Sequence, residues 1–426
     1  MITDKIYSTY IDILKWELVP AMGCTEPISL AYGAAKCREI LGCTPSRITA
    51  RCSGNIVKNV RCVKIPHSDG MTGIASAVVL GALGGNCHKE LEVLCDVTKD
   101  DIVNTHKYIS ENRCDVQLLD STSPLHFILT MEGNGNTAEI EICENHTNII
   151  RIEKNGEIIF TKAFSAHIET PEYGLLNLDD IKEFADSVAI DDVKEVIGRQ
   201  IIHNMAIAQE GFDGKYGIGI ARIITESYPD NTITKMKAMA ASASEARMGG
   251  CELPVIVNSG SGNQGITASV PVIVYAQEKG YSEDKLIRGL VFSNLLAVYQ
   301  KIYIGTLSAF CGAVSAACSA GATITYMCDG STERIRSTIE NTLANIPGII
   351  CDGAKISCAA KIATSVDAAY LAHKMAMKDA SYVPHTGILQ ATISETISCV
   401  GTIGKDGMKE TDREILKIMM NGDECI

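Results

Sequence analysis

The sequence is poor in aromatic and in basic residues, and both shortages exclude classes of function. Aromatic residues make up 5% of the 426 residues, with a single tryptophan, Trp16. A surface that stacks nucleic-acid bases is therefore not expected. Lys and Arg number 38 against 51 Asp and Glu, which gives a net charge of −13. Because phosphate binding requires a basic face, nucleic acids and anionic membranes are excluded as partners.

A targeting segment and a convincing membrane span are also lacking. The first twenty residues are interrupted by charges such as Asp4 and Lys5, so we expect a cytoplasmic protein. The charge-free run 302–328 is long enough to cross a bilayer. However, fourteen of the eighteen residues from Gly305 to Ala322 are Gly, Ala, Ser or Cys, which favours a helix buried within the protein.

Cysteine is abundant, with seventeen residues in all. In a reducing compartment such thiols act as small core residues, metal ligands or catalytic groups, and not as disulfides. The sequence has no Cys-x-x-Cys pair and no His-Glu-x-x-His, so the common zinc motifs are absent. Five thiols gather within forty-eight residues, and two interpretations stay open for them, a soft-metal or iron–sulfur site and plain core packing. They are Cys311, Cys318, Cys328, Cys351 and Cys358.

The residue pattern predicts an α+β protein with two domains. Residues 1–168 are expected to form an α+β domain with N-terminal helices, and residues 169–426 a helical domain with small, buried helices. Strands are predicted at 48–52, 60–65, 91–97, 116–119, 127–131, 138–143, 148–152 and 158–161. Helices are predicted at 71–83, 99–112, 178–211, 232–248, 281–300, 305–327, 331–345, 354–379 and 410–421.

Cys24 lies just before a helix that should begin near Pro27, with Thr25 or Glu26 as the N-cap. A thiol at the positive end of a helix dipole has a lowered pKa, which favours the thiolate as a nucleophile or a general base. The alternative interpretation is a small residue packed at the start of the helix.

A glycine-rich loop, GSGNQG, covers residues 260–265 and follows the apolar run 253–257. It matches the dinucleotide pattern G-x-G-x-x-G, but Pro271 and the β-prone run 272–275 follow too soon for the crossover helix that a Rossmann unit needs. No Gly-Lys-Ser/Thr follows either, so a P-loop is excluded. The remaining interpretations are a backbone cradle for a small anion, such as a carboxylate, and a simple tight loop.

Together these segments resemble the iron–sulfur L-cysteine desulfidases, relatives of the bacterial iron–sulfur L-serine dehydratases. The resemblance covers nearly the whole chain and rests on long, unusual segments. They are PAMGCTEPISLA (20–31), ALGGN (82–86), HTNI (146–149), QEGFDGKYG (209–217), SEARMGG (244–250), NSGSGNQGITA (258–268), LSAFCGA (307–313) and GIICDGAKISCA (348–359).

The resemblance implies a lyase that converts L-cysteine to pyruvate, ammonia and sulfide. It places the ligands of a [4Fe–4S] cluster at Cys311, Cys351 and Cys358 and the acceptor of the α-proton at Cys24. One iron would keep no protein ligand and act as a Lewis acid. The loop residues Ser259, Gly260, Ser261, Gly262, Asn263 and Gln264 would seat the substrate carboxylate. No pyridoxal phosphate is expected.

Three alternatives to cysteine desulfuration stay open. L-Serine dehydration would use the same cluster, a pyridoxal-phosphate lyase would use a lysine such as Lys215, and a non-catalytic iron–sulfur or metal-storage protein would not need Cys24. The expected partner is a small amino acid, and a homodimer is left open. For Cys425, near the C-terminus, the favoured interpretation is an incidental exposed thiol, and the alternative is a tail that occupies the open iron when no substrate is bound.

Overall fold

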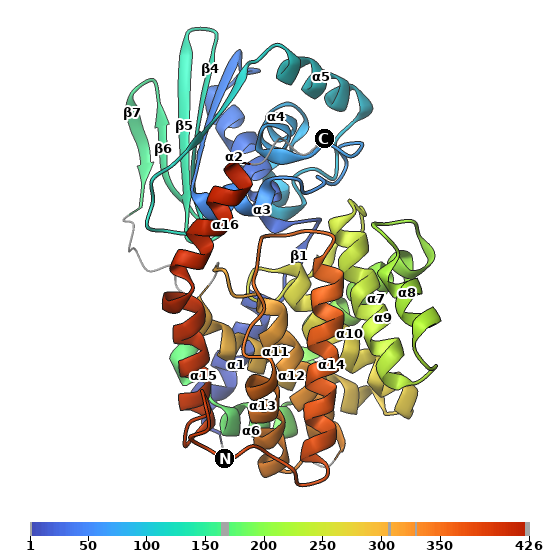
Figure 1. Ribbon diagram of the computed structural model, residues 1–426. Coiled ribbons are helices and arrows are strands. Elements are labelled where there is room, and N and C mark those ends of the chain that lie inside the picture. The colour runs from blue at the N-terminus through green and yellow to red at the C-terminus, as the bar shows by residue number, and fades with distance from the viewer. Residues whose placement is uncertain (1, 163–169, 306–307, 329, 422–426) are drawn as a thin grey trace.

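The computed structural model describes residues 2–162, 170–305, 308–328 and 330–421. It has two layered parts, a twisted sheet with helices on one side and a larger helical part beneath it (Figure 1). The α+β class predicted from the sequence is confirmed. The division at residue 168 stays a prediction, since the chain passes between the two parts more than once.

The sheet has six strands in the order β3-β2-β4-β5-β6-β7. β2 and β3 pair in parallel, and the other neighbours are antiparallel. One face packs on α2 and α4, where Phe127, Leu129, Ile140 and Ile142 are fully buried. The elements of this part are α2 (Thr25–Leu41), β2 (Arg47–Cys52), α3 (Gly54–Val60), α4 (Gly73–Gly84), η1 (Cys87–Glu92), α5 (Lys99–Ser110), β3 (Cys114–Leu118), β4 (His126–Gly133), β5 (Asn136–Cys143), β6 (Ile149–Lys154) and β7 (Glu157–Thr161).

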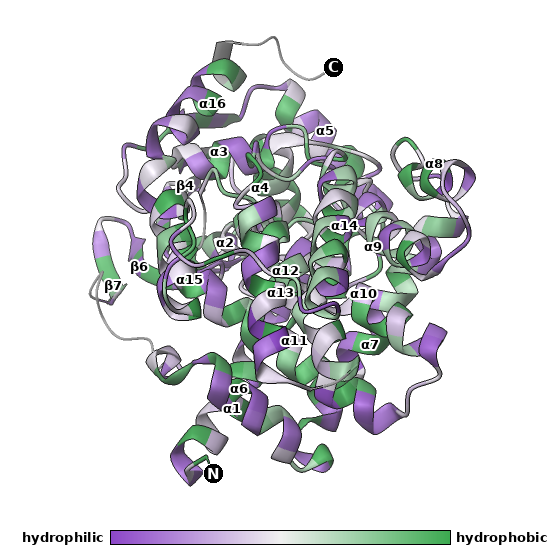
Figure 2. Ribbon diagram, turned by 60° about the horizontal axis from the view of Figure 1, so that its bottom comes forward, coloured by the Kyte–Doolittle hydropathy of each residue, from purple (hydrophilic) through white to green (hydrophobic). Residues whose placement is uncertain are grey.

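The helical part is built around α10, α11 and α12, which are buried along most of their length. In Figure 2 these central helices carry mostly pale or green residues, and purple residues lie on outer elements such as α6 and α16. Its elements are η2 (Tyr173–Leu175), α6 (Leu178–Ser187), α7 (Ile190–Asp213), α8 (Ile220–Ser227), α9 (Thr232–Met248), β8 (Val255–Ile256), α10 (Gly262–Lys279), α11 (Glu283–Ile304), α12 (Gly312–Cys328), α13 (Thr332–Asn345), α14 (Cys358–Ala376), α15 (Ile393–Thr402), η3 (Ile403–Gly407) and α16 (Lys409–Asn421).

Both ends of the chain connect the two parts. α1 (Asp4–Glu17) packs into the helical core through Tyr10, Ile13 and Leu14, and β1 (Pro20–Ala21) then pairs antiparallel with β8. α16 rises from the helical part to the sheet side (Figure 1), where Asp412 accepts a hydrogen bond from Asn55 of α3 at 2.8 Å. Asp412 also forms an ion pair with the buried Lys58.

Several local predictions are wrong, and tertiary packing explains them. The segment 60–65, predicted as a strand, is the last residue of α3 followed by a turn and a single bridge from Lys64 to Thr72. The segment 91–97, also predicted as a strand, is the end of a 3₁₀ helix and a turn. The β-prone run 272–275 lies inside α10, with Pro271 in the same helix, because burial on all sides outweighs local β propensity. The sequence excludes a Rossmann unit because no crossover helix is expected after the loop, but a long helix, α10, does follow it. A Rossmann unit is excluded instead by the strand pairing, because among the described residues β8 pairs only with β1, and that pair is antiparallel.

Two further expectations concern the membrane and the thiols. Among the described residues, no helix combines the length and apolar character that crossing a bilayer requires. The run 302–328 mostly forms α12, whose Ala, Ser and Thr side chains are buried against other helices.

Fifteen of the described cysteines are free thiols, but Cys62 is disulfide-bonded, which contradicts the expectation that disulfides are absent.

Candidate active site

One cavity of about 90 Å³, here called the thiol cavity, lies where the two parts of the molecule meet. It is lined by Cys24 from the sheet part and by Cys311, Cys351 and Cys358 from the helical part. The structure therefore brings together the four cysteines that the resemblance selects. Of the predicted loop residues, all but Gly262 also line it, namely Ser259, Gly260, Ser261, Asn263 and Gln264.

The three thiols of the helical part come from two segments that pair with each other. The backbone N–H of Cys311 donates to Ile349 at 2.9 Å, and that of Cys351 donates to Ala309 at 2.7 Å. Cys311 immediately precedes α12 and Cys358 begins α14. Cys311 therefore lies outside the helix, although the sequence predicts a helix over 305–327 that would contain it. A short backbone ladder thus fixes two of the three thiols next to a helix start that carries the third.

Of these three thiols only Cys351 has a lowered pKa, since its hydrogen bond with Cys311 raises the pKa of Cys311 and burial raises that of Cys358. The hydrogen bond from Cys311, opposed by burial, holds the pKa of Cys351 below its usual value, at about 6. The charge of Lys58 acts in the same direction. Lys301 also lines the cavity, and burial lowers its pKa to about 8.

Lys301 supplies the test of whether the residues fit an anionic metal–sulfur group. It has no carboxylate partner among the described residues, although burying an unpaired ammonium group is costly. A thiolate-bound cluster with net negative charge would supply the missing partner. The donor set of three thiols facing a buried cation therefore fits the iron–sulfur cluster that the resemblance implies.

Cys24 occupies the N-cap position of α2, where Thr25 or Glu26 was expected. Its thiol is 1% exposed and donates a hydrogen bond to the Glu26 carboxylate at 2.9 Å. Burial first, and then the negative charge of Glu26, raise the pKa of the Cys24 thiol well above its usual value. The prediction that the helix dipole lowers this pKa is therefore wrong, because burial and a neighbouring carboxylate outweigh the dipole.

Glu26 is a residue of this site that the sequence did not single out. Besides the Cys24 thiol, its carboxylate accepts hydrogen bonds from Thr25 Oγ1 at 3.2 Å and Asn59 Nδ2 at 3.0 Å. Burial raises its pKa, but the charges of His146 and Arg247 and the thiol hydrogen bond outweigh burial, so the net pKa lies below the usual value. Glu26 is therefore an ionised acceptor in direct contact with Cys24 at neutral pH.

His146 and Arg247 were also missed as functional residues, although both lie in segments that carry the resemblance. His146 is 5% exposed and Arg247 is 3% exposed, and both line the thiol cavity. The Nε2 atom of His146 and the Nε atom of Arg247 have no hydrogen-bond partner within the described structure. Buried polar atoms without partners are rare, and here they face a cavity that a polar ligand can enter.

The glycine-rich loop is held in place by the β1–β8 pair and by Cys24's own segment. Thr25 Oγ1 donates to the carbonyl of Gly260 at 3.1 Å, and Asn258 and Ser261 exchange two backbone hydrogen bonds. Gly262 begins α10 and lies so close to Arg247 that a Cβ there would be 2.3 Å from its Nε atom. The guanidinium group is thus packed against the first turn of an eighteen-residue helix.

The other predicted groups lie elsewhere. Cys318 is packed in the helical core, and Cys328 shares a hydrogen bond with Tyr275 at 3.1 Å. Lys215 is exposed and does not line the thiol cavity. Cys425 lies outside the described residues. A separate trio, Glu39, Cys87 and His88, has its ligand atoms within 4.8 Å of one another, at the surface of the sheet part.

The fold and the site define an α+β protein whose central cavity combines buried thiols with the N-terminus of a buried helix. Residues 88–417 match the family model described as "Serine dehydratase alpha chain". A relative from Lachnoclostridium phytofermentans, named "UPF0597 protein", is 46% identical over 98% of this chain and all of its own length. Relatives of the same name from Desulfitobacterium hafniense and Treponema denticola are 48% and 45% identical, over 98% and 97% of this chain and 98% of each relative. The chain belongs to the serine dehydratase alpha-chain family.

Proposed function

We propose that the protein is an iron–sulfur lyase that catalyses β-elimination from L-cysteine, giving pyruvate, ammonia and hydrogen sulfide. One observation carries the proposal: a single cavity holds three thiols suited to a cluster, a fourth thiol with a buried carboxylate, and a helix N-terminus beside a buried arginine. These are the groups that the reaction needs, namely ligands, a base and a carboxylate seat.

The substrate carboxylate would bind at the start of α10. The backbone N–H groups of Gly262, Asn263 and Gln264 have no acceptor within the described residues, and the positive end of the helix dipole lies there. The Nε atom of Arg247, also without a partner, can donate to the same carboxylate. This seat would fix the substrate between the loop and Cys24.

Cys24 would accept the α-proton. Its thiol already donates to Glu26, so Glu26 can take the thiol proton as the sulfur receives the proton from Cα. The Cys24–Glu26 pair then works as one base, which removes the need for a free thiolate in a site where burial opposes one.

A [4Fe–4S] cluster held by Cys311, Cys351 and Cys358 supplies, when bound, an open iron that acts as a Lewis acid on the leaving group. Lys301 and Lys58 would balance its negative charge from opposite parts of the molecule. The 2-aminoacrylate released by elimination tautomerises and hydrolyses to pyruvate and ammonia.

The family match favours L-serine as a second candidate substrate. The same residues would act, and only the leaving atom would differ. The decisive experiment is anaerobic reconstitution with iron and sulfide, followed by separate assays of pyruvate and sulfide with L-cysteine and L-serine. Sulfide and pyruvate in equal amounts from L-cysteine support the proposal, and pyruvate from L-serine alone replaces it with serine dehydration. No pyruvate from either contradicts both.

The cluster ligands can be tested independently of turnover. Replacing Cys311, Cys351 or Cys358 by Ser should abolish the visible absorbance of the reconstituted cluster, because each removes one of three thiolate ligands. The matched controls are Cys318→Ser and Cys328→Ser, which remove neighbouring thiols in the same part of the chain and should keep the absorbance. Retention of a full cluster in any of the first three variants would contradict the ligand assignment.

A further inference from the structure

A second cavity, here called the outer chamber, adjoins the thiol cavity. Its volume is about 750 Å³, against about 90 Å³ for the thiol cavity, and four residues line both. They are His146, Ser259, Gly260 and Lys301. Pockets that bind small molecules commonly have about 300–1,000 Å³, so the outer chamber alone has the size of a ligand site.

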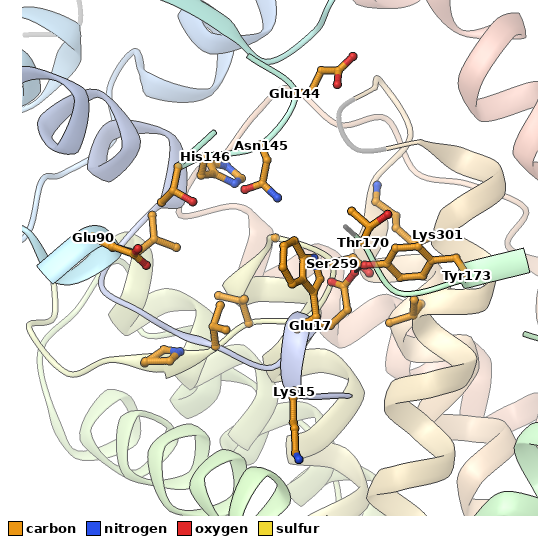
Figure 3. Close-up of a pocket in the computed structure, with 18 of the residues that line it drawn as sticks. Lys15, Glu17, Glu90, Glu144, Asn145, His146, Thr170, Tyr173, Ser259 and Lys301 are labelled. Atoms are coloured by element: carbon orange, nitrogen blue, oxygen red, sulfur yellow. Dashed lines mark hydrogen bonds between the residues drawn. The ribbon is translucent and has the colours of Figure 1, made fainter. Parts of the chain in front are cut away.

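The outer chamber is polar where it meets the thiol cavity. In Figure 3, Glu17, Tyr173 and Ser259 lie close together, Lys301 is near them, and Lys15 points away. The Glu17 carboxylate accepts hydrogen bonds from the Tyr173 hydroxyl and from the backbone N–H of Ser259. Glu17 thus holds the loop residue Ser259, which lines both cavities.

The outer chamber also has apolar side chains, which lie among charged ones such as Glu90 and Lys89. Trp16, 40% exposed, and Ile302, 43% exposed, stand on α1 and α11, and Val19, Leu91, Val257 and Val298 complete this surface. Trp16 is the single tryptophan of the chain. An exposed indole in a chamber with these apolar side chains is suited to cover a ring or an alkyl group of a bound molecule.

L-Cysteine has no group that would reach these side chains while its carboxylate lies at the start of α10. We infer that the outer chamber binds the substituent of an S-substituted L-cysteine, a thioether in which an alkyl or aryl group replaces the thiol hydrogen. This inference rests on the proposed function for its chemistry. The amino-acid head would enter the thiol cavity, and the substituent would remain against Trp16.

The reaction of such a substrate balances without an added oxidant or reductant. The Cα–H and Cβ–S bonds break, a Cα–Cβ double bond forms, and the α-proton passes to the Cys24–Glu26 pair. The sulfur leaves with the electron pair of the Cβ–S bond, takes up a proton and departs as the thiol R–SH. The remaining 2-aminoacrylate hydrolyses to pyruvate and ammonia, as with L-cysteine.

The single tryptophan makes binding measurable without the cluster. Titrating the full-length protein with S-benzyl-L-cysteine should change the Trp16 fluorescence saturably, whereas L-cysteine should change it less, because only the benzyl group contacts the indole. Benzyl mercaptan, which lacks the amino-acid head, should bind at least about tenfold more weakly. No saturable change with S-benzyl-L-cysteine, or equal binding of benzyl mercaptan, would overturn the inference.

Kinetics of the reconstituted enzyme separate this inference from the proposed function. Trp16→Ala should lower the ratio of kcat/KM for S-benzyl-L-cysteine to that for L-cysteine about tenfold, since an aromatic contact of this kind is lost. Tyr382→Ala should keep the ratio, because Tyr382 is an exposed aromatic residue that lines neither cavity. Release of sulfide from L-cysteine with no benzyl mercaptan from the thioether would refute the chamber's role in turnover. A saturable fluorescence change without turnover of either amino acid would instead refute the proposed lyase function and keep the chamber as a ligand site.

Discussion

Replacing Cys24 separates its chemical role from its structural one. Its thiol hydrogen bond to Glu26 ends on a buried, ionised carboxylate, and hydrogen bonds to charged groups contribute about 1.5–3 kcal/mol. Cys24→Ala removes that bond and leaves Glu26 with Thr25 and Asn59 as donors. Cys24→Ser keeps a donor in the same place, so it should cost less of the free energy of unfolding than Cys24→Ala.

Activity should not follow this order. A serine hydroxyl is far less acidic than a thiol and gives its proton to Glu26 much less readily, and alanine has no proton to give. Both variants should therefore lose about 10²–10⁴-fold in kcat, the usual contribution of a general base. Iron content and cluster absorbance should be unchanged, because Cys24 is not among the proposed ligands. The assays are anaerobic pyruvate release, iron analysis and chemical denaturation, with Cys318→Ser as the control for loss of a buried thiol.

Three outcomes would each refute a part of this reasoning. An active Cys24→Ser enzyme would show that the thiol does not take the proton. Loss of iron in both Cys24 variants, with iron retained in Cys318→Ser, would make Cys24 a ligand instead of a base. Equal unfolding free energies for the Ala and Ser variants would show that the thiol hydrogen bond to Glu26 contributes nothing to stability.

The remaining predictions concern Glu26 and the start of α10. Glu26→Gln should lose activity like Cys24→Ser, because the acceptor of the thiol proton is gone. Because the pKa of Glu26 is lowered in the folded protein, its contribution to stability is present above the ordinary carboxyl pKa of about 4.5 and is lost as the pH falls through the folded value. Wild type should therefore lose more unfolding free energy than Glu26→Gln in acid denaturation, and parallel curves would contradict this. Gly262→Ala should raise KM for the amino acid at least about tenfold, since its Cβ would meet Arg247 at 2.3 Å. Gly198→Ala, in a helix with open space around it, is the control, and an equal KM for both would contradict the carboxylate seat.

Much of the architecture follows from local sequence patterns. Alternating apolar residues predict the strands that the structure has at 47–52, 126–133 and 136–143, and periodic patterns predict most of the long helices. These strands and helices are each buried on one face, so their apolar residues recur along the sequence with the period of a strand or of a helix. The helix at 262–279 escapes this reasoning, because burial on every side removes the periodic signal and leaves a β-prone run with a proline.

The residues of the candidate site can also be found partly from the sequence, whereas their arrangement cannot. The sequence alone selects Cys24 and the glycine-rich loop from their local context, and a resemblance selects Cys311, Cys351 and Cys358 among seventeen cysteines. Only the tertiary structure shows that all of them line one cavity, because their segments lie far apart in the chain.

The tertiary structure alone also determines the electrostatics at Cys24. The sequence places the thiol at a helix N-terminus and so predicts a lowered pKa. The folded protein buries it and brings Glu26 to 2.9 Å, which raises the pKa instead. Burial and the distance to a charge depend on how distant segments pack, and no local pattern encodes them. For the same reason, only the contact between the two parts of the molecule shows that Glu26, His146 and Arg247 line one cavity with the outer chamber beside it.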